Sequence, residues 1–262
     1  MAHPWFESAR RPRVLAHRGL VTMDAAAHGV VDNSFAAVAA AHAAGALYVE
    51  SDCHLTRDGT VVLFHDDDLQ RTAGDPRKIA EVSLRELEEV MADRGGLITL
   101  EQALDTFPDV RFNLDVKAPE AAIPVGRTVA AAADRVLLTS FSDARRNEAL
   151  DAALAAGAPL RPATSAGRET LVKLLLALSL RSRALAARAL RDLDALQIPE
   201  RHGAVRVLSP RLIDAAHRHG VEVHVWTVND EADMVRLIEL GCDGIVTDRA
   251  DLALHALGPS AL

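Results

Sequence analysis

Short runs rich in β-branched residues alternate with longer runs rich in alanine and leucine along the whole chain of 262 residues. Strand-like and helix-like segments that alternate without a long linker indicate a parallel sheet whose strands are joined by helices. The strand-like runs cover residues 13–17, 47–55, 110–117, 135–141, 160–163, either 195–198 or 205–208, 221–228 and 244–247. The chain is therefore predicted to be an α/β protein with eight parallel strands.

Eight such units favour closure of the sheet into a (β/α)8 TIM barrel, which commonly takes about 250 residues as one domain. We therefore expect a single domain over residues 1–262. A doubly wound open sheet is the alternative, but no glycine-rich dinucleotide fingerprint follows the first predicted strand. A tight turn at Asp58-Gly59 predicts that 61–65 runs back as an extended segment beside the second strand.

Helical runs separate most of the predicted strands. They cover residues 33–45, 84–91, 100–107, 123–133, 142–156, 168–190, 210–219 and 231–240. Asp32, Asn33 and Ser34 are candidates to cap the first of these helices, and Thr247-Asp248 is expected to cap a last one. Asn33 could instead contact a metal ligand.

Composition narrows the class of partner and the compartment. The net charge is −8, and no long basic block occurs, which argues against nucleic acid as a partner. Cys53 and Cys242 form no spaced motif, so a reducing, cytoplasmic location is expected. Residues 1–13 lack the apolar core of a signal peptide, and 171–180 is too short to span a bilayer and contains Lys173. No stable membrane anchor is therefore expected.

Polar side chains gather where the predicted strands end, which is where barrel enzymes place their active sites. They are His17, Arg18, Glu50, Asp52, Asp115, Lys117, Ser140 and Asn229, and the aromatic Phe141 and Trp226 lie at the same strand ends. A purely structural barrel has little reason to place charge at so many strand ends.

Glu50 and Asp52 lie one residue apart on the second strand, so both side chains point to the same side. A strand in a parallel sheet should be apolar on both faces, and inward carboxylates there require a cation. Oxygen ligands of this kind suit Mg²⁺ or Ca²⁺. Asp115 is the candidate third ligand from the third strand. The alternatives are an acidic edge facing solvent and, for Asp115, an ion pair with Lys117 or an arginine.

His17 and His65 are the candidate catalytic residues. His17 precedes Arg18 and Gly19, where the guanidinium fork suits phosphate oxygens and glycine allows a sharp turn. Histidine titrates in the range needed for a general base and a general acid. The alternatives are a buried His17 bonded to backbone and a His65 in a solvated acidic loop.

Lys117 and Trp226 are candidate substrate-binding residues. Lys117 could hold a phosphate oxygen, or form an ion pair with Glu50 or Asp115, and these roles are compatible. Trp226 could form the floor of the pocket, or simply pack in the core.

At these residues the chain resembles the glycerophosphodiester phosphodiesterase family, over nearly its whole length. The matching segments are Ala16–Gly19, Asp32–Phe35, Glu50–Asp52, Thr56–Gly59, His65–Asp66 with Leu69–Thr72, Asn113–Lys117, Val225–Asn229 and Asp243–Asp248. The resemblance implies a TIM barrel with a small insertion after the second strand, here roughly 66–96. It also implies hydrolysis of glycerophosphodiesters to sn-glycerol 3-phosphate and an alcohol.

The resemblance further implies a role for each candidate. Glu50 and Asp52 would bind a divalent metal (Mg²⁺ or Ca²⁺, with Mn²⁺ also compatible), and Arg18 and Lys117 would hold the phosphate. His17 and His65 would act as acid and base. The third metal carboxylate falls at Asp115, where the family usually has glutamate. Aspartate is one methylene shorter, so its coordination could be mediated by water or require a shifted ion.

Two further functions remain open from the sequence. One is a lipid-directed phosphodiesterase, such as a lysophospholipase D or a phospholipase C-like lyase, in which the apolar helix at 171–190 with its arginines approaches a lipid surface. Packing of that helix on the barrel is the alternative. The other is a catalytically weak glycerophosphate-binding protein, which Asp115 would make possible. The head group, the metal, the nucleophile and the oligomeric state are not fixed by the sequence.

Overall fold

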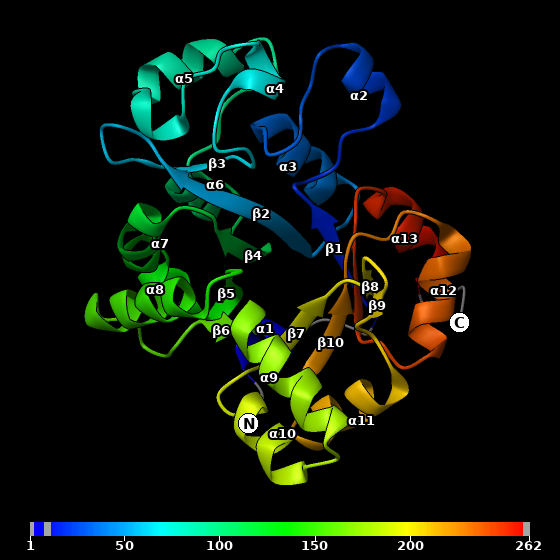
Figure 1. Ribbon diagram of the computed structural model, residues 1–262. Coiled ribbons are helices and arrows are strands. Elements are labelled where there is room, and N and C mark those ends of the chain that lie inside the picture. Colours follow the sequence, from blue (N-terminus) through cyan, green and yellow to red (C-terminus); the bar gives the residue numbers. More distant parts are fainter. Residues whose placement is uncertain (1–2, 8–11, 259–262) are drawn as a thin grey trace.

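A computed structural model describes residues 3–7 and 12–258 of the chain as a barrel of parallel strands. In the described residues the pairing order is β6-β5-β4-β2-β1-β11-β10-β7, and a parallel bridge from Ser165 to Ala195 nearly closes the ring between β6 and β7. Figure 1 shows these strands around a common centre. Their bounds are β1 (Arg13–His17), β2 (Tyr48–Leu55), β4 (Arg111–Val116), β5 (Val136–Thr139), β6 (Ala163–Thr164), β7 (Ala195–Ile198), β10 (Glu222–Val225) and β11 (Gly244–Thr247). The predicted eight-stranded parallel barrel is confirmed.

Helices cover the outside of the barrel, and all but one of them bury apolar side chains; the exception is the short helix at Met23–Ala27, which buries no residue. In α11, for example, Leu212, Ile213, Ala215 and Ala216 are buried. The outer helices are α2 (Met23–Ala27), α3 (Phe35–Ala43), α6 (Leu100–Thr106), α7 (Ala122–Val129), α8 (Asp143–Ala155), α9 (Arg168–Ser179), α10 (Arg183–Leu190), α11 (Pro210–Arg218), α12 (Glu231–Glu239) and α13 (Ala250–Ala256). Two short 3₁₀ helices, η2 (Pro119–Ala121) and η3 (Ala130–Arg135), flank α7.

The segment after β2 forms a small unit of its own beside the barrel, drawn in cyan in Figure 1. It contains β3 (Val61–Leu63), which runs antiparallel to β2, followed by α4 (Gln70–Ala73), η1 (Ile79–Glu81) and α5 (Leu84–Met91). A separate apolar cluster fills it, made of Val62, Phe64, Leu69, Ile79, Val82, Leu87 and Met91. This unit includes the stretch at 66–96 that was expected to be an insertion.

Two local predictions were wrong, and one open alternative is decided. The fifth strand is Ala163–Thr164 rather than 160–163. Of the two candidates for the sixth strand, 195–198 is correct and has the bounds of β7, whereas 205–208 is not a barrel strand, because β9 (Val205–Arg206) pairs only with β8 (Arg201–His202) in a hairpin. The run at 168–190 is two helices, since Arg181 adopts a φ of +53° and the side chain of Ser182 caps α10. A leucine-rich run without glycine or proline hides such a break.

The ends of two helices also differ from expectation. Ser34 alone of the proposed residues caps α3, through a hydrogen bond from Ala37 N. α13 has Arg249 as its N-cap and no side-chain cap bond, so Thr247-Asp248 does not cap it. The side chains of Asn33 and Asp248 are therefore available for other contacts.

Two remaining expectations concern the compartment and the membrane. Cys53 and Cys242 are both buried and form no disulfide. Among the described residues, no helix combines the length and the apolar character needed to cross a bilayer.

Candidate active site

The carboxyl ends of β1, β2 and β4 lie side by side because these strands are parallel neighbours. His17 is the register partner of Glu50, and Asp52 is the register partner of Asp115. Neighbouring strands are about 5 Å apart, so these four side chains start from adjacent positions at one end of the barrel. All three carboxylates are buried.

The loop after β1 is held in an unusual conformation. Arg18 has a φ of +58° and Gly19 of +87°, and Arg18 N donates to Glu50 O at 2.8 Å. A Cβ on Gly19 would lie 2.5 Å from the carbonyl carbon of Ala37 in α3, so only glycine fits there. A non-glycine residue at positive φ costs energy and is kept only where its surroundings fix it. Here that conformation places the Arg18 side chain beside the carboxylates.

His17 forms a dyad with Asp248. Its Nδ1 lies 2.6 Å from Asp248 Oδ1, and the second oxygen of Asp248 accepts from Asn229 Nδ2 at 2.7 Å. Because the carboxylate is an acceptor, Nδ1 carries the proton, and Nε2 faces Glu50 Oε2 at 3.8 Å. The hydrogen bond to His17 lowers the pKa of Asp248, which keeps this carboxyl ionised.

His65 forms a second dyad of the same kind. Its Nδ1 lies 2.6 Å from Asp66 Oδ1, and the other oxygen of Asp66 accepts from Arg71 Nε at 2.5 Å. Arg71 continues to Asp32 at 3.1 Å, and Asp32 accepts from Arg18 at 3.0 Å. An unbroken chain of opposite charges thus connects the His65 dyad in the insertion with the carboxylates in the barrel.

Lys117 lies between two of the carboxylates. Its Nζ is 2.9 Å from Asp52 Oδ1 and 2.7 Å from Asp115 Oδ2. The ion pair with Asp115, which the sequence offered as an alternative role for both residues, is present; the contact with Asp52 was not expected. Arg18 Nε also lies 3.1 Å from Asp52 Oδ2, without hydrogen-bond geometry. Asp52 therefore faces two cations.

The three carboxyl groups are electrostatically unequal. Burial, and then the charges of Asp52 and Asp115, raise the pKa of Glu50 well above its usual value. Burial alone would raise the pKa of Asp52, but Lys117 and Arg18 outweigh it, and that pKa lies below its usual value. Burial also raises the pKa of Asp115 against the effect of Lys117. The negative charge of the cluster is thus incompletely balanced, most of all at Glu50.

The donor chemistry of the cluster suits a hard divalent cation. Glu50 Oε2 and Asp115 Oδ1 are buried without a hydrogen-bond partner, and oxygen atoms of this kind are the ligands that Mg²⁺ and Ca²⁺ prefer. Within residues 3–7 and 12–258, however, no group of three or more His, Cys, Asp or Glu side chains is arranged so that it could hold a metal ion. The Lys117 amine pairs with one oxygen each of Asp52 and Asp115.

Aromatic side chains border this end of the barrel. The rings of Trp226 and Phe141 meet edge to face with centroids 6.1 Å apart, and Lys117 Nζ lies 5.6 Å from the centre of the Phe141 ring. Trp226 is half-buried and also packs on an inner cluster that includes Leu15 and Tyr48. Both interpretations of Trp226, pocket floor and core packing, are compatible with this position.

Sequence reasoning missed two residues that position the candidates. Asp248 and Asp66 received no site role, yet they contact His17 and His65. The contact of Asn33 with a candidate metal ligand, expected as an alternative to capping, is present: Asn33 Nδ2 donates to Asp52 at 3.0 Å. Asp248 follows directly after β11, so the barrel rule applied to the eighth strand would have found it.

Comparison with known proteins decides the family. The model of the glycerophosphoryl diester phosphodiesterase family matches residues 17–252, which include every candidate site residue. This chain belongs to that family. A Mycobacterium tuberculosis protein named "Probable glycerophosphodiester phosphodiesterase 2" is 37% identical over 246 residues, covering 93% of this chain and 89% of the relative.

Other members of the glycerophosphoryl diester phosphodiesterase family are more distant. A mouse protein named lysophospholipase D GDPD3 is 27% identical, covering 94% of this chain and 82% of its own. The crystal structure of a glycerophosphodiester phosphodiesterase from Thermotoga maritima superimposes with a TM-score of 0.69 at 25% identity, covering 94% of this chain and 99% of that one. The family and the barrel fold are thus supported by both sequence and structure.

Proposed function

We propose that the protein hydrolyses glycerophosphodiesters to sn-glycerol 3-phosphate and an alcohol, by histidine acid–base catalysis that depends on a divalent metal. The observation that carries the proposal is the presence of two His–Asp dyads beside one buried, incompletely neutralised carboxylate cluster. The names of its relatives support the same reaction.

Glu50, Asp52 and Asp115 would hold the metal, which is Mg²⁺, Ca²⁺ or Mn²⁺. When bound, such an ion neutralises phosphate charge and stabilises the charge that builds up in the transition state. Arg18 and Lys117 bring positive charge to the same place from two strands, and both are suited to non-bridging phosphate oxygens. Trp226 and Phe141 border the site and would limit the shape of the alcohol group.

His17 and His65 would move the protons. Each ring is fixed by a carboxylate at Nδ1, which leaves Nε2 as the atom that exchanges a proton with substrate. One histidine takes the proton of the nucleophile. If the nucleophile is water, sn-glycerol 3-phosphate forms directly; if it is the glycerol hydroxyl of the substrate, a cyclic glycerophosphate forms first and water must then open it. The other histidine gives a proton to the leaving alkoxide. The dyads are alike in form, so their assignment to acid and base requires kinetics.

The test is a phosphodiesterase screen across head groups, with Mg²⁺, Ca²⁺, Mn²⁺ and chelator in parallel. We expect release of sn-glycerol 3-phosphate that stops in chelator and returns when one of the metals is added. Full activity in chelator would remove the metal from the proposal. Tight binding of glycerophosphodiesters without product would instead favour the binding-protein alternative.

A lysophospholipase D activity is the second candidate, favoured by the mouse relative and by the exposed Phe141 at the rim. An acyl chain would lie along this apolar rim while the phosphate occupies the same site. Comparing glycerophosphocholine with its monoacyl form separates the two activities, because only the lipid-directed enzyme prefers the acylated substrate.

A further inference from the structure

The hairpin of α9 and α10 leaves a row of large apolar side chains exposed on the protein surface. Val172, Leu176 and Leu180 are exposed by 47%, 59% and 71%, and their spacing of four residues puts them on one face of α9. Leu185 at the start of α10 is exposed by 47%. The opposite face of α9 buries Leu174 and Ala177 against the barrel. The helix therefore packs on the core with one side and presents a second apolar side outward.

The same hairpin carries a concentration of positive charge on an otherwise acidic chain. Residues 168–191 contain six basic residues and one acidic one, whereas the whole chain has a net charge of −8. The basic residues are Arg168, Lys173, Arg181, Arg183, Arg188 and Arg191. None of these six side chains has an ion pair or a hydrogen bond within the described part of the chain. Nearby, Arg146 pairs with Asp143 and Arg161 pairs with Asp194.

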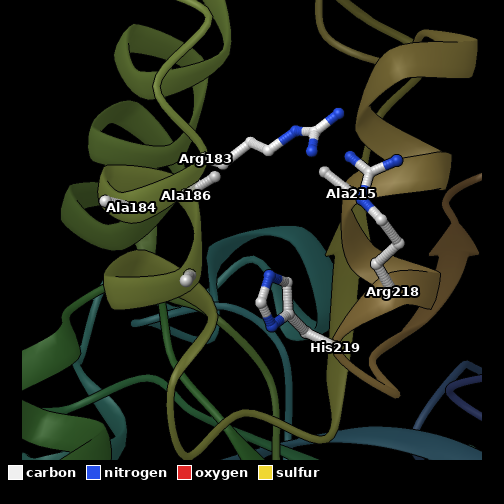
Figure 2. Close-up of a pocket in the computed structure, with 7 residues that line it drawn as sticks. Arg183, Ala184, Ala186, Ala215, Arg218 and His219 are labelled. Carbon is white, nitrogen blue, oxygen red and sulfur yellow. The ribbon is translucent and has the colours of Figure 1, made fainter.

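A groove between α10 and α11 extends this cationic surface. Its volume is about 440 Å³, and Figure 2 shows Arg183 and Arg218 leaning over it from opposite helices, with the His219 ring below them. Alanine side chains form the rest of its lining, and no acidic residue contributes. A groove of this size, lined by two arginines and a histidine, suits a phosphate group.

The apolar row begins near the candidate active site. Arg168 N, at the first residue of α9, donates to the carbonyl of Phe141 at 2.9 Å, and Phe141 is one of the aromatic residues at the site rim. The start of α9 therefore lies beside the site rim, and the more exposed Leu176 and Leu180 follow about two to three helical turns further along.

From these observations we propose that the α9–α10 hairpin docks on the surface of an anionic lipid bilayer. An exposed apolar face that sits among unpaired basic residues enters the boundary between head groups and acyl chains, while the basic side chains pair with lipid phosphates. A second copy of this chain fits the surface poorly. In a two-fold dimer the same patch faces itself, so six unpaired cations would meet six others. The proposal concerns binding and does not depend on the reaction that the barrel performs.

The direct test is co-sedimentation of the whole protein with vesicles of phosphatidylcholine alone and with vesicles that also contain phosphatidylglycerol. We expect binding to the anionic vesicles that is about tenfold stronger or more, and that weakens as salt is added. Absence of binding to anionic vesicles would overturn the proposal. Equal binding to both vesicle types would also overturn it.

Two pairs of variants separate the contributions of the surface. Leu176→Ser with Leu180→Ser removes apolar side chains from the row without changing the charge, and Leu154→Ser on α8, which is 46% exposed, is its control. Arg183→Glu with Arg188→Glu reverses two charges, with Arg127→Glu on α7 as the control. We expect each double variant to lower vesicle binding by about tenfold or more, and each control to leave it unchanged.

Two control measurements separate docking from catalysis and from self-association. Hydrolysis of a soluble glycerophosphodiester should be the same in all these variants, so loss of activity would concern the proposed function and not the docking surface. Light scattering without vesicles should give one mass for wild type and variants. A dimer that disappears only in the leucine variant, or equal loss of binding in variants and controls, would contradict the lipid surface as the occupant.

Discussion

The two ends of the barrel both hold buried charges, but only one end balances them. At the amino end, Arg13 and Glu222 are 3% and 5% exposed and satisfy one another. At the carboxyl end, Glu50 and Asp115 are also buried, and each keeps an oxygen without a hydrogen-bond partner. Carboxylates that are buried to a similar extent are thus fully paired at the amino end and incompletely paired at the carboxyl end.

The amino end is a closed network. Arg13 donates to both oxygens of Glu222 at 2.6 and 2.8 Å and to Tyr48 Oη at 2.6 Å. Tyr48 Oη donates to the carbonyl of Trp5 at 3.0 Å, and His224 Nε2 lies 3.1 Å from Glu222. Trp5 belongs to α1 (Pro4–Glu7). The indole ring of Trp5 is fully buried and closes this end of the barrel. The strong charges of this network are paired, as a structural role requires.

The comparison shows that buried charges with a structural role differ from those of the candidate active site in whether they are paired. Burial and the presence of charge do not distinguish the two ends. A buried carboxylate without a partner is costly, so a site that keeps one requires a cation at some stage of its work. If the two ends have different tasks, variants at each end should fail in different ways.

The largest expected effect is on catalysis at the carboxyl end. His17→Ala and His65→Ala should each lower kcat/KM by about 10² to 10⁴, the usual range for loss of a positioned acid or base. Steady-state kinetics on a glycerophosphodiester measures this, with circular dichroism to establish that both variants fold. Rates near wild type in both variants would end the assignment.

The matching change at the amino end should affect stability. Glu222→Gln removes the charge that Glu222 places against the buried Arg13 guanidinium, which should cost about 3 to 5 kcal/mol in the free energy of unfolding. Denaturant unfolding gives this value, while kcat/KM measured well below Tm should stay near that of wild type. A catalytic defect without a loss of stability would erase the distinction between the ends.

Glu222 also sets how the stability of the protein depends on pH in acid. Burial opposes ionisation of Glu222, but Arg13 and His224 outweigh it and bring its pKa down to about 2 from an ordinary 4.5. An acid with a depressed pKa stabilises the fold above its ordinary value, and this stabilisation is lost as pH falls from about 4.5 towards 2. Glu222→Gln should therefore flatten the stability curve in this window. An unchanged curve would contradict the pairing.

A smaller effect is expected from the residues that position the histidines. Asp248→Asn and Asp66→Asn keep the size of each side chain but remove the charge that holds Nδ1–H, so activity should fall roughly tenfold to a hundredfold. The pH profile of kcat/KM should shift as well, because each histidine loses a negative neighbour. A purely structural role would lower Tm and leave the pH profile in place.

The smallest effect concerns the unbalanced carboxylate itself. The pKa of Glu50 is raised, so its ionisation costs stability in metal-free protein as pH rises above the ordinary value. In chelator, Glu50→Gln should therefore gain about 1 kcal/mol of unfolding free energy at neutral pH and none near pH 4, while activity is lost. Thermal unfolding at both pH values measures it. Destabilisation by this change would mean that Glu50 is already balanced.

Much of the fold could be predicted, because strand and helix periods are local properties. β1, β11 and α5 have the bounds that the sequence indicated. The break at Arg181 and the bounds of the two-residue strand β6 were not predicted, because short elements and helix ends depend on packing more than on propensity.

The sequence by itself determined which chemical groups stand at the carboxyl ends of the strands. Side chains alternate along each strand and the barrel strands are parallel, so Glu50, Asp52 and Asp115 must lie at the same end of the sheet. Only the tertiary structure decided which charge meets which. His17 and Asp248 lie 231 positions apart along the chain and become neighbours because β1 pairs with β11. Coulomb energies depend on distances in space, and closure of the barrel sets those distances.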